Sequence, residues 1–147
     1  MVDQPRKKVL ILCTGNSCRS QMAEALINGR MPDSWVAYSA GAEPKGYIHL
    51  LALKALNEIG IGHFGKSKNI ADLPKIVFNL VITVCDDAAE NCPTRLSEGK
   101  RVHLGFPDPA LAEGSEADRL DAFRSVRDDM SDKILSFLEN YPVESPS

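Results

Sequence analysis

The sequence predicts an α/β protein in which a parallel sheet is flanked by helices. Short apolar runs alternate along the chain with longer segments whose apolar residues recur every three or four positions. Glycine and proline stand between most of these segments, where turns are expected. Such an alternation is typical of a parallel sheet, because helices supply the crossover connections that parallel strands need. We expect a single domain over residues 1–147, since no linker or internal repeat divides the chain.

The first half of the chain predicts two pairs of a strand followed by a helix. The strands are expected at residues 7–12 and 35–39, which are short and rich in apolar side chains. The helices are expected at residues 20–30 and 49–59, whose apolar residues fall on one side. Gly60 stands where a helix typically ends, directly after the second of these segments.

The second half of the chain predicts two more strands and one long helix. A buried strand is expected at residues 80–84 and a shorter one at residues 101–104, followed by a loop at residues 106–115. Residues 116–139 predict an amphipathic helix with one apolar stripe. The stripe consists of Leu120, Phe123, Val126, Met130, Ile134 and Phe137. The tail, residues 141–147, is expected to be frayed.

Composition and charge are those of a globular protein and argue against a nucleic-acid-binding protein. The chain of 147 residues is 44% hydrophobic and 25% charged, close to the average of globular proteins. The net charge of −3 divides into +3 over residues 1–73, with nine Lys and Arg against six Asp and Glu, and −6 over residues 74–147, with eight against fourteen. Neither half carries a dense basic stripe, so no nucleic-acid partner is expected. The positive excess of the first half would suit a small anion.

We expect neither a membrane span nor an export signal. No segment approaches the ~20 consecutive apolar residues of a membrane span. The first apolar run is Val9-Leu10-Ile11-Leu12, too short for the core of a signal peptide. The expected location is therefore the cytoplasm. In a reducing compartment, the four cysteines of this chain are expected to be catalytic or metal-binding rather than joined in structural disulfides.

The segment between the first strand and the first helix predicts an anion site. It consists of Cys13, Thr14, Gly15, Asn16, Ser17, Cys18, Arg19 and Ser20. A loop of this length can wrap its backbone N–H groups around one tetrahedral oxyanion, and the N-terminus of the following helix adds positive potential. Arg19 would hold two anion oxygens with its guanidinium fork. Gly15 is expected to adopt a backbone conformation that residues with a Cβ avoid.

Cys13 would lie at the base of this cradle. The helix N-terminus and Arg19 both favour a thiolate, so the pKa of Cys13 is expected to lie below that of an ordinary thiol. The pattern of a cysteine and an arginine with five residues between them also occurs by chance, and the alternative is a strand-to-helix turn with a buried, inert cysteine. The placement of this motif between a strand and a helix favours a catalytic role for Cys13. Cys18 is expected to have a packing or accessory redox role.

Two more cysteines follow the third predicted strand. Cys85 would emerge at the same edge of the sheet as Cys13 if both strands are parallel, and six residues separate it from Cys92. Three thiols within reach of one another suggest a relay, in which the second attacks the first and the third attacks the second. A four-cysteine zinc site fits these spacings poorly. Two buried cysteines without a function are the other alternative.

A carboxylate follows the fourth predicted strand. Asp108 lies in the segment Gly105-Phe106-Pro107-Asp108-Pro109-Ala110. An isolated Asp-Pro pair is most often a turn. At the carboxyl edge of the sheet, however, Asp108 could lie over the bound anion and donate a proton to the oxygen that departs as water.

Together these motifs resemble the thioredoxin-coupled arsenate reductases, which are built on the low-molecular-weight protein tyrosine phosphatase fold. The resemblance covers roughly residues 7–140 and is most specific in the segment VLILCTGNSCRSQMAEA and in the segment that joins Cys85 to Cys92. Further matching stretches are residues 38–41, 58–61 and 106–110. The resemblance implies a four-stranded parallel sheet flanked by helices. It also implies a function in arsenic detoxification.

The resemblance implies how the cradle would act. Cys13 would attack arsenate while Arg19 and the loop amides hold it. Ser17 and Ser20 would hydrogen-bond the thiolate or shape the loop, and Asp108 would be the general acid.

The resemblance likewise implies a role for the later cysteines. Cys85 would attack the Cys13–arsenic adduct and release arsenite, and Cys92 would then form the Cys85–Cys92 disulfide that thioredoxin reduces. The stretch between Cys85 and Cys92 is expected to rearrange on oxidation. The protein would act as a monomer and would require no cofactor.

Some members of the family bind a potassium ion near the cradle, at positions that match Asn16, Glu24 and Ser39. The acidic fourth ligand of that site falls at Asn69 here, which removes one negative charge. This chain therefore matches the family's set of potassium ligands only in part, and a potassium ion is expected on that basis.

A phosphatase of the same fold is the first alternative function, because phosphate and arsenate are nearly isosteric. Phosphotyrosine-cleaving relatives usually carry aromatic residues after the Asp-Pro pair, where this chain has Ala110 and Leu111. Phosphatase chemistry also has no use for Cys92. We expect at most a side activity of this kind.

Two further alternatives concern the thiols. An arsenic-sensing or redox-sensing binding module would keep the cysteines without needing Arg19 or Asp108. A reductase could also use glutathione with glutaredoxin, or mycothiol, in place of thioredoxin. The presence of both Cys85 and Cys92 favours thioredoxin.

Overall fold

The computed structural model describes residues 6–85 and 100–141 and confirms the predicted parallel sheet. Its strands are β1 (Lys7–Cys13), β2 (Trp35–Gly41), β3 (Leu80–Thr83) and β4 (Lys100–His103). They pair in parallel in the order β2-β1-β3-β4, which places β1 and β3 at the centre. All four strands therefore present their carboxyl ends at one edge of the sheet, where ligand sites form in open parallel sheets.

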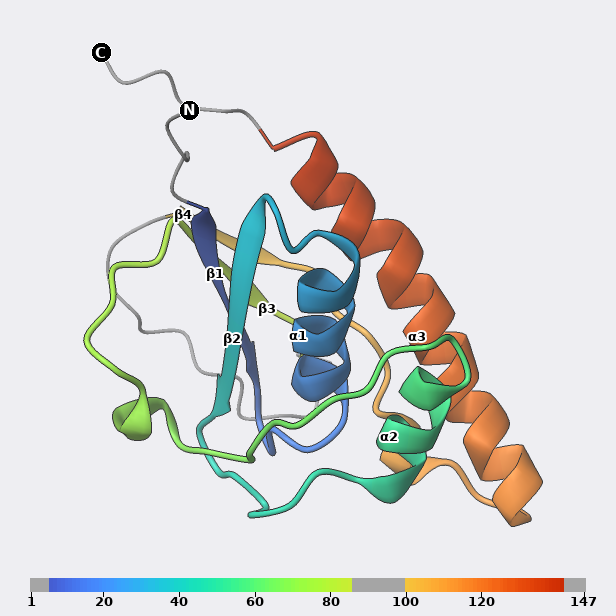
Figure 1. Ribbon diagram of the computed structural model, residues 1–147. Coiled ribbons are helices and arrows are strands. Elements are labelled where there is room, and N and C mark those ends of the chain that lie inside the picture. Colours follow the sequence, from blue (N-terminus) through green and yellow to red (C-terminus); the bar gives the residue numbers. More distant parts are fainter. Residues whose placement is uncertain (1–5, 86–99, 142–147) are drawn as a thin grey trace.

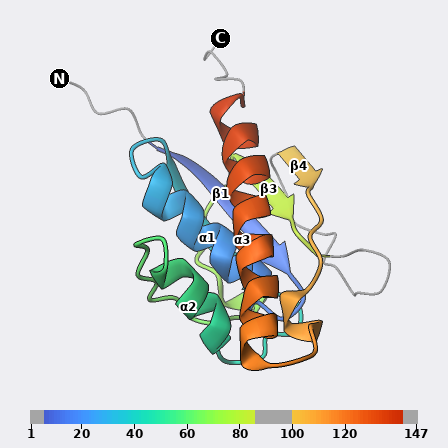
Figure 2. The ribbon, with the colours of Figure 1, turned by 90° about the vertical axis from the view of Figure 1, so that its right-hand side faces the viewer.

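Three helices cover one face of this sheet. They are α1 (Arg19–Arg30), α2 (Leu50–Asn57) and α3 (Glu116–Glu139), and they lie on the same side of the strands in Figure 1 and in Figure 2. The bounds of α3 are those that its apolar stripe predicts. The helix predicted over residues 49–59 is too long at both ends. His49 caps its start and accepts a hydrogen bond from the Leu51 N–H at 3.1 Å, and Glu58 is the cap at its end. None of the described helices is both long and apolar enough to cross a membrane.

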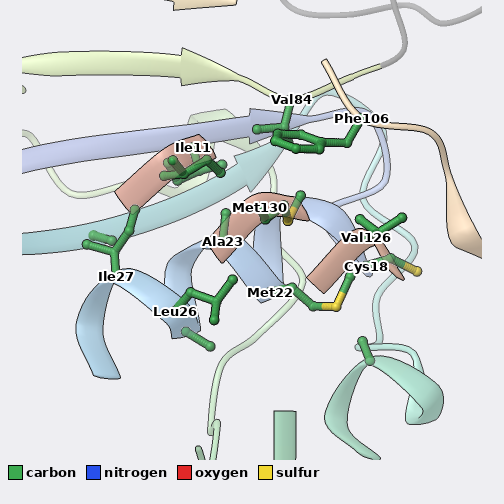
Figure 3. Close-up of a cluster of buried hydrophobic side chains, with 14 of the residues drawn as sticks. Ile11, Cys18, Met22, Ala23, Leu26, Ile27, Val84, Phe106, Val126 and Met130 are labelled. Carbon is green, nitrogen blue, oxygen red and sulfur yellow. The ribbon is translucent and has the colours of Figure 1, made fainter. Parts of the chain in front are cut away.

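The main hydrophobic core lies between the sheet and the three helices. Successive side chains of a strand point to opposite faces, and Val9 and Ile11 of β1 point toward the helices. The core is completed by fully buried side chains of α1 and α3, several of which are drawn in Figure 3. They include Met22, Ala23, Leu26, Ile27, Phe123, Met130 and Ile134.

On the opposite face of the sheet, the described part of the chain places an irregular segment that precedes β3. Leu10 and Leu12 of β1 pack there against Phe78. This segment contains one short 3-10 helix, η1 (Ile70–Asp72), which the apolar pattern does not predict. Pro74 follows it closely and cannot continue a helix, because it lacks a backbone N–H. Among residues 6–85 and 100–141, the α-helices thus lie on one face of the sheet.

An arginine of α3 fixes the end of α2. Arg127 Nη1 donates to the backbone oxygen of Ala55 at 2.8 Å and to Glu58 at 2.9 Å. The last carbonyl groups of a helix lack partners within the helix, so a cation there satisfies one of them and complements the helix dipole. Arg124 adds a second contact to Glu58 at 2.9 Å. These bonds hold α2, and with it the segment that precedes α2, against α3.

Tyr141 departs from the predicted frayed tail. Its ring packs edge-on against Trp35, with 5.6 Å between the ring centroids. The remainder of that predicted tail, residues 142–147, lies outside the described residues.

Candidate active site

The carboxyl edge of the sheet holds a cavity of about 410 Å³. It lies where the loop after β1 meets the segments that follow β2 and β4. Its lining residues are Cys13, Thr14, Gly15, Asn16, Ser17, Cys18, Arg19, Glu43, Lys45, Asp108 and Leu111. The fold therefore brings the predicted anion loop and the predicted acid to the same place, although they are far apart in the sequence.

The loop after β1 carries backbone N–H groups beside this cavity. Within residues 6–85 and 100–141, no backbone or side-chain acceptor receives a hydrogen bond from the N–H groups of residues 15–18. These residues line the cavity and lead directly into the N-terminus of α1. Donors that converge at the positive end of a helix can bind an oxyanion. The loop thus has the properties of the predicted anion cradle.

Asn16, and not Gly15, is the left-handed residue of the loop. Asn16 has a φ of 47°, whereas Gly15 is not among the residues with positive φ, so the prediction for Gly15 is wrong. Asparagine tolerates this conformation when its side chain bonds locally. Its Nδ2 donates to Ser20 Oγ at 2.8 Å, and its Oδ1 accepts from the Lys68 N–H at 2.8 Å. Gly15 is needed for space, because a Cβ there would lie 3.2 Å from the side chain of Lys45.

Two serines and one glycine hold the loop in place. Ser17 Oγ donates to the backbone oxygen of Tyr47 at 2.7 Å, and Ser20 Oγ accepts the bond from Asn16. These serines are expected to hydrogen-bond the thiolate or to shape the loop, and these two bonds shape the loop. Gly41, at the end of β2, lies directly behind it. A Cβ on Gly41 would lie 2.5 Å from the backbone oxygen of Thr14, so only glycine allows this close approach.

Arg19 and Asp108 meet at the cavity. Arg19 is buried, its Nη1 donates to the backbone oxygen of Phe106 at 3.1 Å, and its Nη2 lies 3.6 Å from Asp108 Oδ2. Asp108 Oδ1 accepts from the Ala110 N–H at 3.0 Å and caps the short helix η2 (Pro109–Leu111). The Asp-Pro pair is therefore a turn and also a cavity carboxylate. One carboxyl oxygen is held by the turn, and the other faces Arg19.

Cys13 and Cys85 emerge at the same edge of the sheet, as predicted. Cys13 is the last residue of β1, Cys85 follows the parallel strand β3, and both are buried. The hydroxyl of Thr14 donates to Cys85 Sγ at 3.8 Å. The Cys85 thiol in turn donates to the backbone oxygen of Leu12 at 4.0 Å. Cys92 and the stretch between Cys85 and Cys92 lie outside the described residues.

Cys18 differs from the other described cysteines. It is 6% exposed and belongs to the main core, where Figure 3 shows it with Met22 and Val126. Burial raises the pKa of Cys18 to about 12, and the negative charge of Asp108 acts in the same direction. Cys18 therefore stays a protonated thiol near neutral pH, which agrees with the packing role expected for it.

Comparison with known proteins places this site in a family. The chain matches the model of the low molecular weight phosphotyrosine protein phosphatase family over residues 8–144. It belongs to this family. A curated arsenate reductase of Bacillus licheniformis is 46% identical to it over 136 residues, which cover 91% of this chain and 96% of the relative. The family predicted from the three motifs is thereby confirmed.

Solved structures of this family share the fold. An arsenate reductase from Archaeoglobus fulgidus superposes with a TM-score of 0.76 at 26% identity, covering 90% of this chain and 99% of the other. A thioredoxin-dependent arsenate reductase from Corynebacterium glutamicum superposes with a TM-score of 0.61 at 26% identity, covering 94% of this chain and 65% of the other. The four-stranded parallel sheet is therefore the sheet of this family.

The expected potassium ligands come together behind the loop, where hydrogen bonds join them to one another. Asn16 Nδ2 donates to Ser39 Oγ at 3.0 Å, and Ser39 Oγ donates to Glu24 Oε1 at 2.5 Å. Asn16 Oδ1 already accepts from the side chain of Gln21 as well as from the Lys68 N–H. The oxygen of Asn69 caps η1. Because hard cations need several oxygen ligands, a potassium ion here would have to take oxygens of Asn16, Glu24 and Ser39 from these hydrogen bonds, and the site stays a prediction.

The sequence motifs miss two charged residues of the cavity. Glu43 and Lys45 reach it from the turn after β2. Backbone bonds tie this turn to the loop, from the Glu43 N–H to the Thr14 oxygen and from the Lys45 N–H to the Gly15 oxygen, both at 3.0 Å. No spacing in the sequence marks either residue. Their position just after a strand, at the edge where ligand sites form, is the one signal available.

Proposed function

We propose that this protein reduces arsenate to arsenite through a relay of Cys13, Cys85 and Cys92, with thioredoxin as the reductant, in arsenic detoxification. One observation carries the proposal. A cradle of backbone N–H groups lies beside two buried cysteines at the ends of two adjacent parallel strands. The curated relatives named arsenate reductases support arsenate as the oxyanion.

The first step would form a bond between Cys13 sulfur and arsenic. The Cys13 thiolate attacks arsenate held by the loop amides and Arg19, and one arsenate oxygen leaves as water. Asp108 lies on the cavity with one oxygen toward Arg19, from where it would give a proton to the departing oxygen. The helix N-terminus and Arg19 favour the thiolate that this step requires.

The second step would reduce the arsenic. The Cys85 thiolate attacks Cys13 sulfur, a disulfide forms between them, and the electron pair of the sulfur–arsenic bond stays on arsenic. Arsenic(V) thereby gains two electrons and leaves as arsenite, while the two thiols are oxidised. The hydrogen bond from Thr14 supports this role of Cys85, because it holds the Cys85 sulfur at the loop that begins beside Cys13.

The last steps would carry the disulfide away from the cavity. The Cys92 thiolate attacks Cys85 and releases Cys13 as a thiolate, and the dithiol of thioredoxin then reduces the Cys85–Cys92 disulfide. The similar C. glutamicum structure is of an arsenate reductase named as thioredoxin-dependent, which supports this reductant. Glutathione with glutaredoxin is the alternative reductant.

A phosphatase activity at the same cavity is the second candidate, because the family model takes its description from phosphotyrosine protein phosphatases. The cradle, Arg19 and Asp108 would serve both reactions. Leu111 stands at the cavity and is 77% exposed, so it provides no aromatic wall for a phosphotyrosine ring. We therefore assign phosphate-ester hydrolysis to this protein only as a side activity.

The deciding experiment measures NADPH oxidation with thioredoxin and thioredoxin reductase, with and without arsenate. Arsenate-dependent turnover is expected in the wild type and is expected to vanish in Cys92→Ser. Hydrolysis of p-nitrophenyl phosphate should survive in the same variant, which shows that the cradle is intact. Turnover only with glutathione and glutaredoxin would replace thioredoxin as the reductant. Survival of both activities in Cys92→Ser would refute the relay.

A further inference from the structure

We propose that Lys45 is a second substrate-binding cation of this cavity and that it holds a small inorganic oxyanion against the loop together with Arg19. The inference rests on the proposed oxyanion function of the cavity. It adds to that function a residue that comes from a different segment of the chain.

The backbone of Lys45 is fixed against the anion loop. Its N–H donates to the Gly15 oxygen at 3.0 Å, and the next residue, Gly46, donates to Ser67 Oγ at 3.1 Å. Ser67 Oγ in turn donates to the same Gly15 oxygen at 3.2 Å. Lys45 therefore starts from a defined point beside the loop.

The side chain of Lys45 lies along the loop. An added Cβ on Gly15 would lie 3.2 Å from both Cγ and Cε of Lys45, so the aliphatic stem runs directly over this glycine. Lys45 also lines the cavity that contains Cys13 and Arg19. The glycine thus leaves the space through which the lysine stem approaches the cradle.

The ammonium group of Lys45 is available to an anion. Within residues 6–85 and 100–141, no carboxylate or other acceptor forms an ion pair or a hydrogen bond with it. Its positive charge nevertheless affects the pKa of two groups near the cavity. It lowers the pKa of Cys18 against the larger effect of burial, and after burial and Arg119 it contributes to the lowered pKa of His49.

Lys45 offsets negative charge among the side chains that line the cavity. The charged residues that line it are Arg19 and Lys45 on one side and Glu43 and Asp108 on the other. Arg19 also lies 3.6 Å from Asp108, so part of its charge is already offset. With Lys45 these four side chains are neutral in sum, and without it they would carry a net negative charge, to which a Cys13 thiolate adds. Lys45 therefore reduces the repulsion that an incoming oxyanion meets.

Inorganic phosphate tests this role without any turnover. Its dissociation constant is measured by calorimetric titration of the reduced protein in the wild type, Lys45→Met and Lys45→Arg, with Lys54→Met as the control. Lys54 is an exposed lysine of α2 outside the cavity lining. We expect Lys45→Met to weaken phosphate binding by about 10-fold, as the loss of a charge-assisted contact would. Lys45→Arg and Lys54→Met should stay near the wild-type value, and added salt should shrink the difference.

An NMR titration of His49 verifies that the charge has been removed without loss of the fold. Its pKa should rise in Lys45→Met and remain at the wild-type value in Lys45→Arg. Wild-type phosphate affinity in Lys45→Met, despite the raised pKa of His49, would overturn the proposal. Equal weakening by Lys45→Met and Lys45→Arg would also overturn it, because the side chain would then act only through packing. So would the lack of phosphate binding to the wild type.

The test separates this inference from the proposed reductase function. If phosphate binding depends on Lys45 but arsenate drives no thiol-dependent turnover, Lys45 stands as an anion-binding residue and the relay fails. If arsenate turnover proceeds but Lys45→Met changes neither phosphate affinity nor the KM for arsenate, the relay stands and the role of Lys45 fails.

Discussion

The hydroxyl of Thr14 donates a hydrogen bond to Cys85 Sγ across 3.8 Å. It joins the first residue of the anion loop to the cysteine that follows the neighbouring strand. Parallel pairing of β1 with β3 brings these two positions together, because both strands end at the same edge. The loop that would bind the oxyanion therefore also contacts the proposed second nucleophile.

The first prediction concerns this bond. Thr14→Val keeps the shape of the side chain but removes the donor that holds the Cys85 sulfur beside the loop, so arsenate turnover should fall about 10-fold. Thr14→Ser, which keeps the hydroxyl, should stay near the wild-type rate. Hydrolysis of p-nitrophenyl phosphate needs no second thiol and should change little in either variant. An equal loss of both activities in Thr14→Val would mean that Thr14 acts on the cradle instead.

The second prediction concerns Cys18. Because the pKa of this buried thiol is raised to about 12, it should resist alkylation by iodoacetamide at pH 8, as peptide mass spectrometry would show. Cys18→Ala should keep arsenate turnover within about 2-fold and cost about 1 kcal/mol of unfolding free energy, as expected for a small change in a packed core. A loss of turnover as complete as that of Cys13→Ser would assign Cys18 to the relay.

The third prediction concerns the proposed acid. Asp108→Asn keeps an oxygen that can accept the bond from the Ala110 N–H, so the turn should persist. The variant cannot donate the carboxyl proton, and kcat for arsenate and for p-nitrophenyl phosphate should both fall by about 10² or more. Phosphate binding should not weaken, since a negative charge beside Arg19 has been removed. Unchanged kcat values would leave Asp108 with its role in the turn alone.

The fourth prediction concerns the pH dependence of stability. Hydrogen bonds from Arg124, and then from Arg127, lower the pKa of Glu58 from 4.5 to about 2 in the folded protein. A lowered folded pKa contributes stability that is complete above the unfolded pKa of Glu58 and disappears as the pH falls toward about 2. Urea unfolding should show Glu58→Gln as less stable than the wild type at pH 7, with a difference that shrinks below pH 4.5.

A matched control for this prediction is Glu139→Gln. Glu139 is exposed at the end of α3, and within the described part of the chain it forms no ion pair. Its replacement should leave stability nearly unchanged across the same pH range. A difference between Glu58→Gln and the wild type that stays constant from pH 7 to pH 3 would contradict the ionic origin of the effect.

Local patterns in the sequence predict most of the elements. The apolar stripe of residues 116–139 gives the bounds of α3, and the apolar run before Cys13 gives most of β1. The patterns fail at η1, because three residues are too few to show a period. They also extend α2 too far at both ends. Capping by His49 depends on the geometry of one side chain, which periodicity does not show.

The order of strands and helices follows from local periodicity, and the cysteines, arginine and aspartate of the candidate site follow from residues at short spacing. Three features become visible only in the folded chain: the left-handed conformation of Asn16, the contact of Thr14 with Cys85 and the position of Lys45 over Gly15. The two contacts join segments that are distant along the chain, and the conformation of Asn16 depends on its hydrogen bonds to such segments. Pairing of the strands and packing of the side chains fix such relations, and no local pattern encodes them.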